Sequence, residues 1–395
     1  MKTSLPPAFK PLLQPRKRVA SAPAPIPVTD MGKPNKTPYM ANDERSGALM
    51  LTYRPSKAPT IFDEFDTPIK LICYQHQAPG DALMFIAAIR DLHMSYPKRF
   101  VTDMRLAGNS PDLLRNNPHN TLLPEHGDPS ILKVRGEYTD SVKNTNIRPT
   151  KFICAFHKDL EDKLGIRIIP TTAHSDVYLS AEEKSWRSQI WEMLKKDVPF
   201  WLINAGTKLD YTCKHWEVAR FQDVVTRLPD ITFVQVGMIK PNHQHTPLTG
   251  DNVINLLGKT NTRQLCRLVY WSAGVITPVS FLMHLSAAIE PHPMYKRNTR
   301  PCIVIAGGRE GPVWESYNCQ QYLHTCGKLP CCSHGGCWKA RIIKQNDGDS
   351  KDNRLCKMPV KSASGQMIPK CMDMITADDV VRHVNEYLEA YSEPK

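Results

Sequence analysis

The sequence predicts an α/β protein in which two successive Rossmann-like domains, each of parallel strands and helices, face a cleft. Three observations support this fold class. Short apolar runs typical of buried strands alternate with stretches of helical periodicity. This rhythm stops in a polar stretch near residue 195 and then starts again. The length of 395 residues suits about two domains and is large enough to bury a core without disulfides.

The first half contains a strand, turn, helix and strand in succession. Residues 69–74 predict a buried strand, 82–96 a helix that stops at Pro97, and 99–106 the next strand. The apolar run 152–156 predicts a further strand. Residues 181–195 predict one helix, and its expected apolar stripe is Trp186, Ile190, Met193 and Leu194.

The second half repeats this alternation. The expected strands are 199–204, 232–236, 252–257, 274–277 and 302–305. The expected helices are 216–228, 262–272, 280–289 and 376–391. Asn261 or Thr262 should cap the second of these helices. Thr376 should cap the last, with Asp379 as its capping-box acid.

Composition divides the chain further. The expected parts are a disordered basic, proline-rich tail at 1–59, a first Rossmann-like domain at 60–195, a second at 196–325, a cysteine-rich metal-binding insertion at 326–375 and a C-terminal helix at 376–395. The tail holds 11 of the 33 prolines and +7 of the net charge of +12. Such a segment buries too little to offset its ordering entropy. The alternative is a basic arm that binds nucleic acid.

Targeting signals are missing from the expected places. The first 20 residues contain basic side chains but lack the apolar core of a signal peptide. The uncharged run 269–289 is long enough to span a bilayer, but Pro278 and several polar residues divide it into a strand, a turn and a helix. We therefore expect a cytoplasmic protein without a membrane span.

Three strand-to-helix turns carry candidate binding residues. Asp81 follows Gly80, which is expected to permit a tight turn, and is either a helix N-terminal acid or a catalytic base. Gly206, Thr207 and Lys214 follow the first strand of the second half and suit a phosphate, although ordinary surface lysines also occur in such loops. Ser280 could cap a helix or bind an anion. His284 is either a satisfied core histidine or a ligand-binding residue.

Four segments carry a family resemblance. In order, they read LICYQHQAPGDALMFIAAIRDLHMSYP, NAGTKLDYTCKHW, NLLGKTNTRQL and ITPVSFLMHLSAAIEP. Together they resemble glycosyltransferase family 9, the ADP-heptose heptosyltransferases of the GT-B fold. The resemblance covers about residues 68–310, and it implies that 60–195 is the acceptor domain and 196–325 the donor domain.

The resemblance implies transfer of a sugar, heptose by family default, from a nucleotide diphosphate to an acceptor hydroxyl with inversion. Asp81 would be the general base, and Lys214 would neutralise the leaving diphosphate. The implied donor-binding residues are Gly206, Thr207, Lys214, Lys259, Thr260, Ser280 and His284. No catalytic metal is expected. The acceptor would be a glycan or a protein.

The chain departs from the family at two places. Val279 stands where the family commonly has an acid, and no glutamate follows Gly237 to bind the ribose. The alternative function is therefore a catalytically inactive protein of the same fold that binds nucleotide or nucleic acid.

Five clustered cysteines predict a structural zinc or iron site. They are Cys331, Cys332, Cys337, Cys356 and Cys371. Four thiolates suit a tetrahedral metal, so one of the adjacent pair Cys331 and Cys332 is not expected to be a ligand. A redox or disulfide role and free thiols are the alternatives. A cysteine-rich finger on a family 9 body also resembles the iron-binding, oligomeric autotransporter heptosyltransferases.

Overall fold

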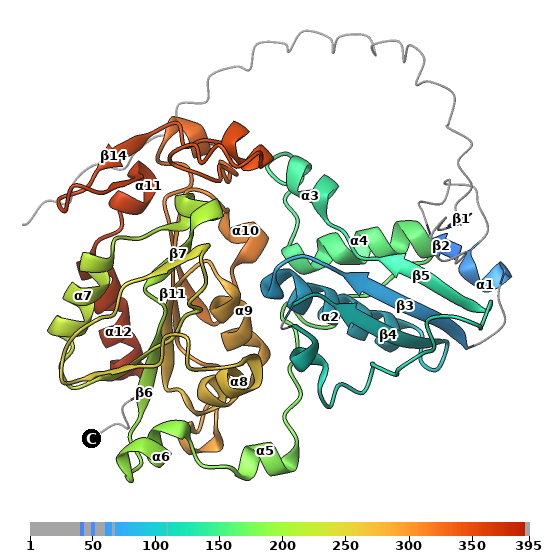
Figure 1. Cartoon of the computed structure of the whole chain (residues 1–395), viewed down its shortest axis with the longest axis horizontal. Coiled ribbons are helices and arrows are strands. Elements are labelled where there is room, and N and C mark those ends of the chain that lie inside the picture. The colour runs from blue at the N-terminus through green and yellow to red at the C-terminus, as the bar shows by residue number, and fades with distance from the viewer. Residues whose placement is uncertain (1–39, 43–48, 52–59, 65–67, 109, 392–395) are drawn as a thin grey trace, which may run out of the picture. The chain divides into compact units, whose positions relative to one another are not determined.

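The computed structural model describes residues 40–42, 49–51, 60–64, 68–108 and 110–391. These residues belong to one compact unit, Tyr39–Lys395. Strands and helices alternate along the chain and build an α/β fold with two main, largely parallel sheets (Figure 1). The α/β class that the sequence predicts is therefore confirmed. The division into two domains around a cleft, with the boundaries expected above, stays a prediction.

The first sheet has the strand order β1-β2-β5-β3-β4. Its parallel centre consists of β3 (Ile69–Gln75), β4 (Phe100–Leu106) and β5 (Ile131–Arg135). The short strands β1 (Met40–Asn42) and β2 (Leu49–Leu51) extend it, and β2 pairs with β5.

Strands β1 and β2 fall inside the range 1–59, for which the sequence predicts a disordered tail. Pairing with β5 supplies the backbone hydrogen-bond partners that local composition does not reveal. The other residues of that range lie outside the described part of the chain.

Helices α2 (Pro79–Ser95) and α4 (Phe152–Leu164) pack together beside this sheet (Figure 1). The prediction of a strand at 152–156 is wrong, because Phe152, Phe156 and Leu160 recur at the four-residue spacing of one helix face. All three are buried, and the ring of Phe156 lies 5.6 Å from that of Phe85 on α2. A five-residue apolar run does not by itself distinguish a strand from the start of a buried helix.

The second sheet is parallel throughout and has the order β10-β8-β6-β11-β12-β13. Its strands are β6 (Phe200–Ile203), β8 (Thr232–Gln235), β10 (Val253–Asn255), β11 (Gly274–Pro278), β12 (Cys302–Gly307) and β13 (Gln320–His324). The associated helices are α7 (Val218–Arg227), α8 (Thr262–Trp271), α9 (Phe281–Ala288) and α12 (Ala377–Tyr391).

Two predicted helix caps are confirmed. Asn261 caps α8 in a capping box with Gln264. At α12 the Asp379 carboxylate accepts from the Thr376 N–H at 2.8 Å, and the Asp379 N–H donates to Thr376 Oγ1 at 3.3 Å. These side chains satisfy helix N–H groups that have no partner within the helix.

The single helix expected at 181–195 is wrong. The chain forms α5 (Ala181–Ser185) and α6 (Gln189–Leu194), because Trp186 adopts an extended conformation with ψ 141° between them. Of the expected apolar stripe only Ile190 is buried, while Trp186, Met193 and Leu194 are exposed. The periodicity is present in the sequence, but in this segment only the Ile190 side chain of the expected stripe reaches the core.

The remaining elements are short. The helices are α1 (Ile61–Glu64), α3 (Thr139–Asn144), α10 (Pro312–Glu315) and α11 (Lys370–Asp373), with 3-10 turns η1 (Ser110–Leu114), η2 (Leu209–Lys214), η3 (Pro293–Tyr295), η4 (Pro330–Cys332) and η5 (Ser350–Asn353). The strands are β7 (Gly206–Lys208), β9 (His243–His245), β14 (Pro359–Lys361) and β15 (Met367–Pro369). Among the helices in the described part of the chain, none combines the length and apolarity needed to cross a bilayer.

The two sheets share a hydrophobic core. One buried cluster contains Phe85 and Met84 of α2 together with Leu282 of α9. A second cluster, which includes Phe221 and Val380, lies between the second sheet and helices α7 and α12. The contact between α2 and α9 brings the start of α2 close to the loops of the second sheet.

Candidate functional site

The first sheet contributes an aspartate and a tyrosine to one edge. Strands β3 and β5 are neighbours, so the segments that follow them start at the same edge of the sheet. Asp81 lies in the first turn of α2, after β3, and Tyr138 precedes α3, after β5. The hydroxyl of Tyr138 donates a hydrogen bond to the Asp81 carboxylate.

The second sheet contributes a lysine and a glutamate. Lys214 ends the loop after β6, and Arg309 and Glu310 follow β12. Lys214 Nζ lies 3.0 Å from Glu310 Oε2, and Arg309 pairs with the same glutamate. The Arg309 guanidinium carbon also lies 4.9 Å from the centre of the Tyr211 ring.

Electrostatics join the two sides. Burial raises the pKa of Asp81, while the hydrogen bond from Tyr138 and the charge of Lys214 act in the opposite direction and lower it. Burial, followed by repulsion from Arg309, lowers the pKa of Lys214 to about 8. Burial also raises the pKa of Glu315, which Lys214 and Arg309 oppose. The structure therefore brings Asp81 and Lys214 from different sheets into one group of interacting charges.

Gly80 has a different role from the one expected. It lies inside α2 and does not have the positive φ of a tight turn. A β-carbon at Gly80 would lie 2.9 Å from His284 Cδ2 and 3.3 Å from Nε2. The missing side chain therefore lets the His284 ring approach the start of α2.

His284 is a buried residue with a hydrogen-bond partner. Its Nδ1 lies 2.7 Å from the Tyr317 hydroxyl, which lies 3.6 Å from Met84 Sδ on α2. Burial, followed by the charge of Lys214, lowers the pKa of His284 to about 3, so the ring is neutral near pH 7. His284 thus meets the expectation for a core histidine, and it also lies near Asp81 and Lys214.

Thr207 and Ser280 follow the neighbouring strands β6 and β11. Thr207 lies on β7, which pairs with β9, so the segment after β6 contains a short strand. Ser280 occupies the N-cap position of α9, but its hydroxyl lies 2.7 Å from Thr277 Oγ1 and does not cap the helix. Of the N–H groups at the start of α9, that of Met283 donates to the Ser280 carbonyl at 3.1 Å.

Gly206 also allows a close approach, since a β-carbon there would overlap the His245 ring. Lys259 and Thr260 lie farther along the chain, after β10. Lys259 is exposed and donates to the Asn255 carbonyl at 3.2 Å. No described contact joins Lys259 or Thr260 to Asp81 or Lys214. Their predicted role in binding the nucleoside stays a prediction.

Five thiols line one small cavity of about 10 Å³, which we call the thiol cavity. They belong to Cys213, Cys331, Cys337, Cys356 and Cys371. Cys332 does not line it, and its thiol faces the Thr325 carbonyl at 3.5 Å. That one of these two adjacent cysteines is not a metal ligand stays a prediction.

The thiols of this cavity differ in how readily they ionise. A hydrogen bond from the Cys213 thiol lowers the pKa of Cys356 to about 7, whereas burial raises the pKa of Cys337 and raises that of Cys371 to about 12. Arg309 and three lysines also line the cavity and would offset thiolate charge. In the described ranges, however, no three His, Cys, Asp or Glu side chains are gathered closely enough to hold a metal ion as they stand.

Sequence reasoning missed several residues of this site. Tyr138 was missed because β5, which places it, was not recognised. Glu315 lies on a four-residue helix that has no periodicity to read. Cys213 lies far from the other cysteines in the sequence, and only the packing of η2 against the cysteine-rich segment brings it to them. Arg309 and Glu310 were not missed, because their glycine turn follows a buried strand, and the sequence leaves open whether the arginine contacts a substrate or forms a surface ion pair.

Comparison with known proteins identifies the fold. No family model and no curated protein sequence matches the chain. The iron-containing dodecameric glycosyltransferase TibC from enterotoxigenic E. coli H10407 matches with a TM-score of 0.54 and 15% identity, over 82% of this chain and 80% of TibC. The structure of TibC in complex with ADP-D-beta-D-heptose matches with a TM-score of 0.53 and 14% identity, over 83% of this chain and 78% of TibC. The family 9 glycosyltransferase from Veillonella parvula matches with a TM-score of 0.51 and 11% identity, over 82% of this chain and 99% of the Veillonella chain.

These likenesses show a fold of the glycosyltransferase family 9, heptosyltransferase-like type. The resemblance seen in the sequence motifs is confirmed. At these identities the comparisons concern the fold, and the reaction of this chain has to be argued from its own residues.

Proposed function

We propose that the chain is an inverting glycosyltransferase that moves a sugar from a nucleotide-diphosphate donor to an acceptor hydroxyl. The observation that carries the proposal is the joining of Asp81 and Lys214, which come from different sheets, in one group of charges. A carboxylate and a cation are the two groups that this reaction needs. The TibC structure with ADP-D-beta-D-heptose makes an ADP-linked heptose the first donor to test.

In the proposed mechanism, Asp81 accepts the proton of the acceptor hydroxyl as its oxygen attacks the anomeric carbon. The bond between that carbon and the diphosphate oxygen breaks at the same time. Burial raises the pKa of Asp81, which makes its carboxylate a stronger base. The Tyr138 hydroxyl orients the carboxylate.

The leaving diphosphate gains negative charge, which Lys214 would neutralise. In the ligand-free chain Lys214 pairs with Glu310, so a bound diphosphate would compete with that carboxylate for the lysine. Thr207 and the N–H groups after Ser280 would hold the remaining phosphate oxygens. The acceptor would be a glycan or a protein hydroxyl.

A structural zinc or iron in the thiol cavity belongs to the proposal. The cavity thiols and the surrounding cations support it. Gathering the thiols around an ion requires their side chains to turn toward the cavity. The metal would supply a cross-link within the cysteine-rich segment, and no step of sugar transfer passes through it. A cytoplasmic setting stays a prediction.

The first experiment is a thermal-shift panel of ADP, GDP, UDP and CDP. A ligand at 100 times its Kd should stabilise the protein by about 2.7 kcal/mol. We expect one diphosphate to stabilise the wild type and Lys196→Ala, whose lysine is exposed and outside the site, but not Lys214→Ala. If no diphosphate stabilises the wild type, the donor site that we propose does not exist.

A second experiment separates catalysis from binding. Asp81→Asn should bind the nucleotide as the wild type does and lose transfer by about 10²–10⁴-fold, the range of general-base catalysis. Turnover equal to that of the wild type would remove Asp81 from the mechanism.

A further inference from the structure

Lys214, Glu310 and Arg309 form a row of three charges at one edge of the second sheet. Lys214 follows β6, and Arg309 and Glu310 follow β12. Strand β11 pairs in parallel with both β6 and β12, so the segments after these strands start at the same edge. Lys214 Nζ lies 3.0 Å from Glu310 Oε2, and Arg309 pairs with the other oxygen of that carboxylate. One carboxylate thus has two cations as partners.

The three side chains differ in exposure. The exposed fraction of the side chain is 24% for Lys214, 7% for Arg309 and 5% for Glu310. An anionic ligand that enters from solvent therefore meets Lys214 first. Glu310 Oε2 makes no hydrogen bond to any of the described residues, so its contact with Lys214 depends on charge rather than on a directed bond. Lys214 can therefore change partners without breaking a hydrogen bond to Glu310.

Arg309 is held in place independently of Lys214. Its Nε donates to the Lys339 carbonyl at 2.6 Å, and its guanidinium carbon lies 4.9 Å from the centre of the Tyr211 ring. When Lys214 moves away, Arg309 remains beside Glu310 and still compensates the buried carboxylate. The exchange of partners therefore avoids the large cost of a buried charge without a partner.

The backbone that carries Lys214 is also held. The Cys213 N–H donates to the Ala340 carbonyl at 3.0 Å, and the Ile342 N–H donates to Thr212 Oγ1 at 3.0 Å. The main chain directly before Lys214 is thus tied to the cysteine-rich segment.

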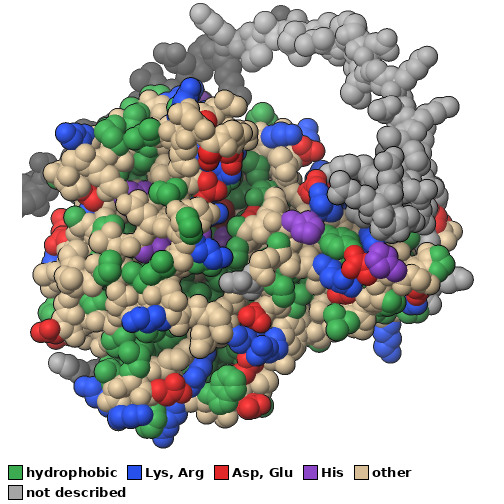
Figure 2. Space-filling model, in the orientation of Figure 1, with side chains coloured by type: hydrophobic (Ala, Val, Ile, Leu, Met, Phe, Trp, Pro, Cys, Tyr) green, Lys and Arg blue, Asp and Glu red, His purple; other side chains and the backbone are tan. Residues whose placement is uncertain are grey.

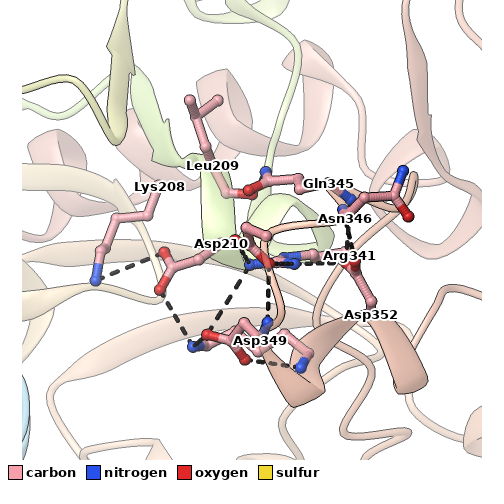
Figure 3. A network of polar contacts seen from close by, with 10 residues as sticks. Lys208, Leu209, Asp210, Arg341, Gln345, Asn346, Asp349 and Asp352 are labelled. Atoms are coloured by element: carbon pink, nitrogen blue, oxygen red, sulfur yellow. Dashed lines mark hydrogen bonds and ion pairs between the residues drawn. The ribbon is translucent and has the colours of Figure 1, made fainter.

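A network of charges, shown in Figure 3, fixes the same turn from its other end. Arg341 is fully covered and pairs with Asp349 and Asp352. Lys351 joins this network to the turn, because its Nζ lies 3.5 Å from Asp210 and also pairs with Asp349. With the turn held, a change of partner by Lys214 needs only rotation of its flexible side chain.

We propose that Glu310 is the resting partner of Lys214, which releases this lysine to a bound diphosphate and takes it back when the nucleoside diphosphate leaves. The inference rests on the proposed function, because that function assigns the diphosphate to Lys214. It adds Glu310 as a positioning residue, which acts through Lys214 and does not touch the substrate. Since binding has to break the ion pair, Glu310 weakens diphosphate binding and speeds product release.

The test is the affinity of Glu310→Gln for ADP, measured by calorimetry on the full chain at pH 7. Glutamine keeps the size of the side chain and removes its charge. ADP should bind about tenfold or more tightly than to the wild type, because a close charge pair changes affinity by at least that factor. The dissociation rate of ADP, measured by displacement of a fluorescent ADP analogue, should fall by a similar factor.

Asp103→Asn is the matched control. Asp103 on β4 is also a buried carboxylate with a partly exposed cation as its partner. Its side chain is 1% exposed and lies 2.8 Å from that of Arg105, which is 31% exposed. The control removes the same charge from the first sheet and should leave the ADP affinity unchanged. An equal gain of affinity in both variants would overturn the inference, because it would reflect net charge alone.

A second variant covers the case in which Glu310→Gln does not fold. Glu310→Asp keeps a charge that compensates Arg309 and shortens the reach toward Lys214 by one methylene. Its ADP affinity should exceed that of the wild type, and damage to the fold would not produce this result, because damage weakens binding. Unchanged ADP affinity in the folded variant would overturn the inference. Weaker binding would overturn it too and would mean that Glu310 orients Lys214 for the ligand.

Failure of the inference and failure of the transferase proposal give different results. If ADP stabilises the wild type but not Lys214→Ala, and Glu310→Gln does not tighten ADP binding, the donor site stands and the inference fails. If none of ADP, GDP, UDP and CDP binds to the wild type or to Glu310→Gln, both proposals fail.

Discussion

Replacing Gly80 with alanine should destabilise the protein, although alanine is the better helix former. The reason is the His284 ring, whose Cδ2 atom would lie 2.9 Å from the new β-carbon. That ring cannot move freely, because its Nδ1 is held at 2.7 Å from the buried Tyr317 hydroxyl. Either the hydrogen bond is disturbed or the start of α2 moves outward.

The magnitude follows from two opposing effects. Overpacking of a core contact costs about 1–3 kcal/mol. Alanine in place of glycine within a helix gains roughly 0.5–1 kcal/mol. The net loss in the wild-type background should therefore lie between about 0 and 2.5 kcal/mol, with a central value of about 1 kcal/mol. In a His284→Ala background the clash is gone, and the same change should stabilise by the helix term alone.

The assay is a double-mutant cycle measured by urea unfolding of the wild type, both single variants and the double variant. The sign reversal between backgrounds is the diagnostic result, since it isolates the coupling between the two positions. Gly80→Ala should also lower kcat, because Asp81 follows directly in the helix. An equal effect of Gly80→Ala in both backgrounds would refute the packing argument.

Three further predictions follow from the charged and buried contacts. Tyr138→Phe removes the hydrogen bond that lowers the pKa of Asp81, so the acid limb of the pH profile of kcat/KM should move to higher pH, and an unchanged limb would contradict this. Burial raises the pKa of Asp81, so the contribution of this carboxyl group to stability should fall as the pH rises from about 3.9 through the raised pKa. Asp81→Asn should remove this loss of stability. Thermal unfolding measured across the pH range checks both statements. Trp216→Phe removes the hydrogen bond of 2.9 Å from Trp216 Nε1 to the Ile375 carbonyl, although Arg220 still donates to that carbonyl. The free energy of unfolding, measured in urea, should fall by about 1–2 kcal/mol. No change would mean that α12 does not depend on this contact.

The surface bears on the alternative of a nucleic-acid-binding protein. On the face shown in Figure 2, Lys and Arg side chains are interspersed with Asp and Glu rather than gathered in one basic patch. The excess positive charge lies mainly in residues 1–59, most of which lie outside the described residues. Salt-dependent binding of nucleic acid, lost on deletion of that range, would support this alternative.

The predictable parts of the fold share one property. The strands around Ile72, Leu202 and Ile303, and the caps at Asn261 and Thr376, are encoded by neighbouring residues in the chain. The errors occur where local patterns are ambiguous. The apolar run at 152–156 was too short to separate a strand from a helix, and the stripe at 181–195 was interrupted at Trp186.

The sequence by itself determined the alternation of strands and helices, the positions of Asp81 and Lys214 after strands, and the abundance of thiols near the C-terminal end. Only the tertiary structure decided which of these residues meet. Asp81 reaches Lys214 because α2 packs against α9, and Cys213 reaches Cys356 because the 341–352 loop binds the 209–214 turn. The physical reason is that local periodicity depends on adjacent residues, whereas these contacts depend on how distant buried surfaces and charges satisfy one another.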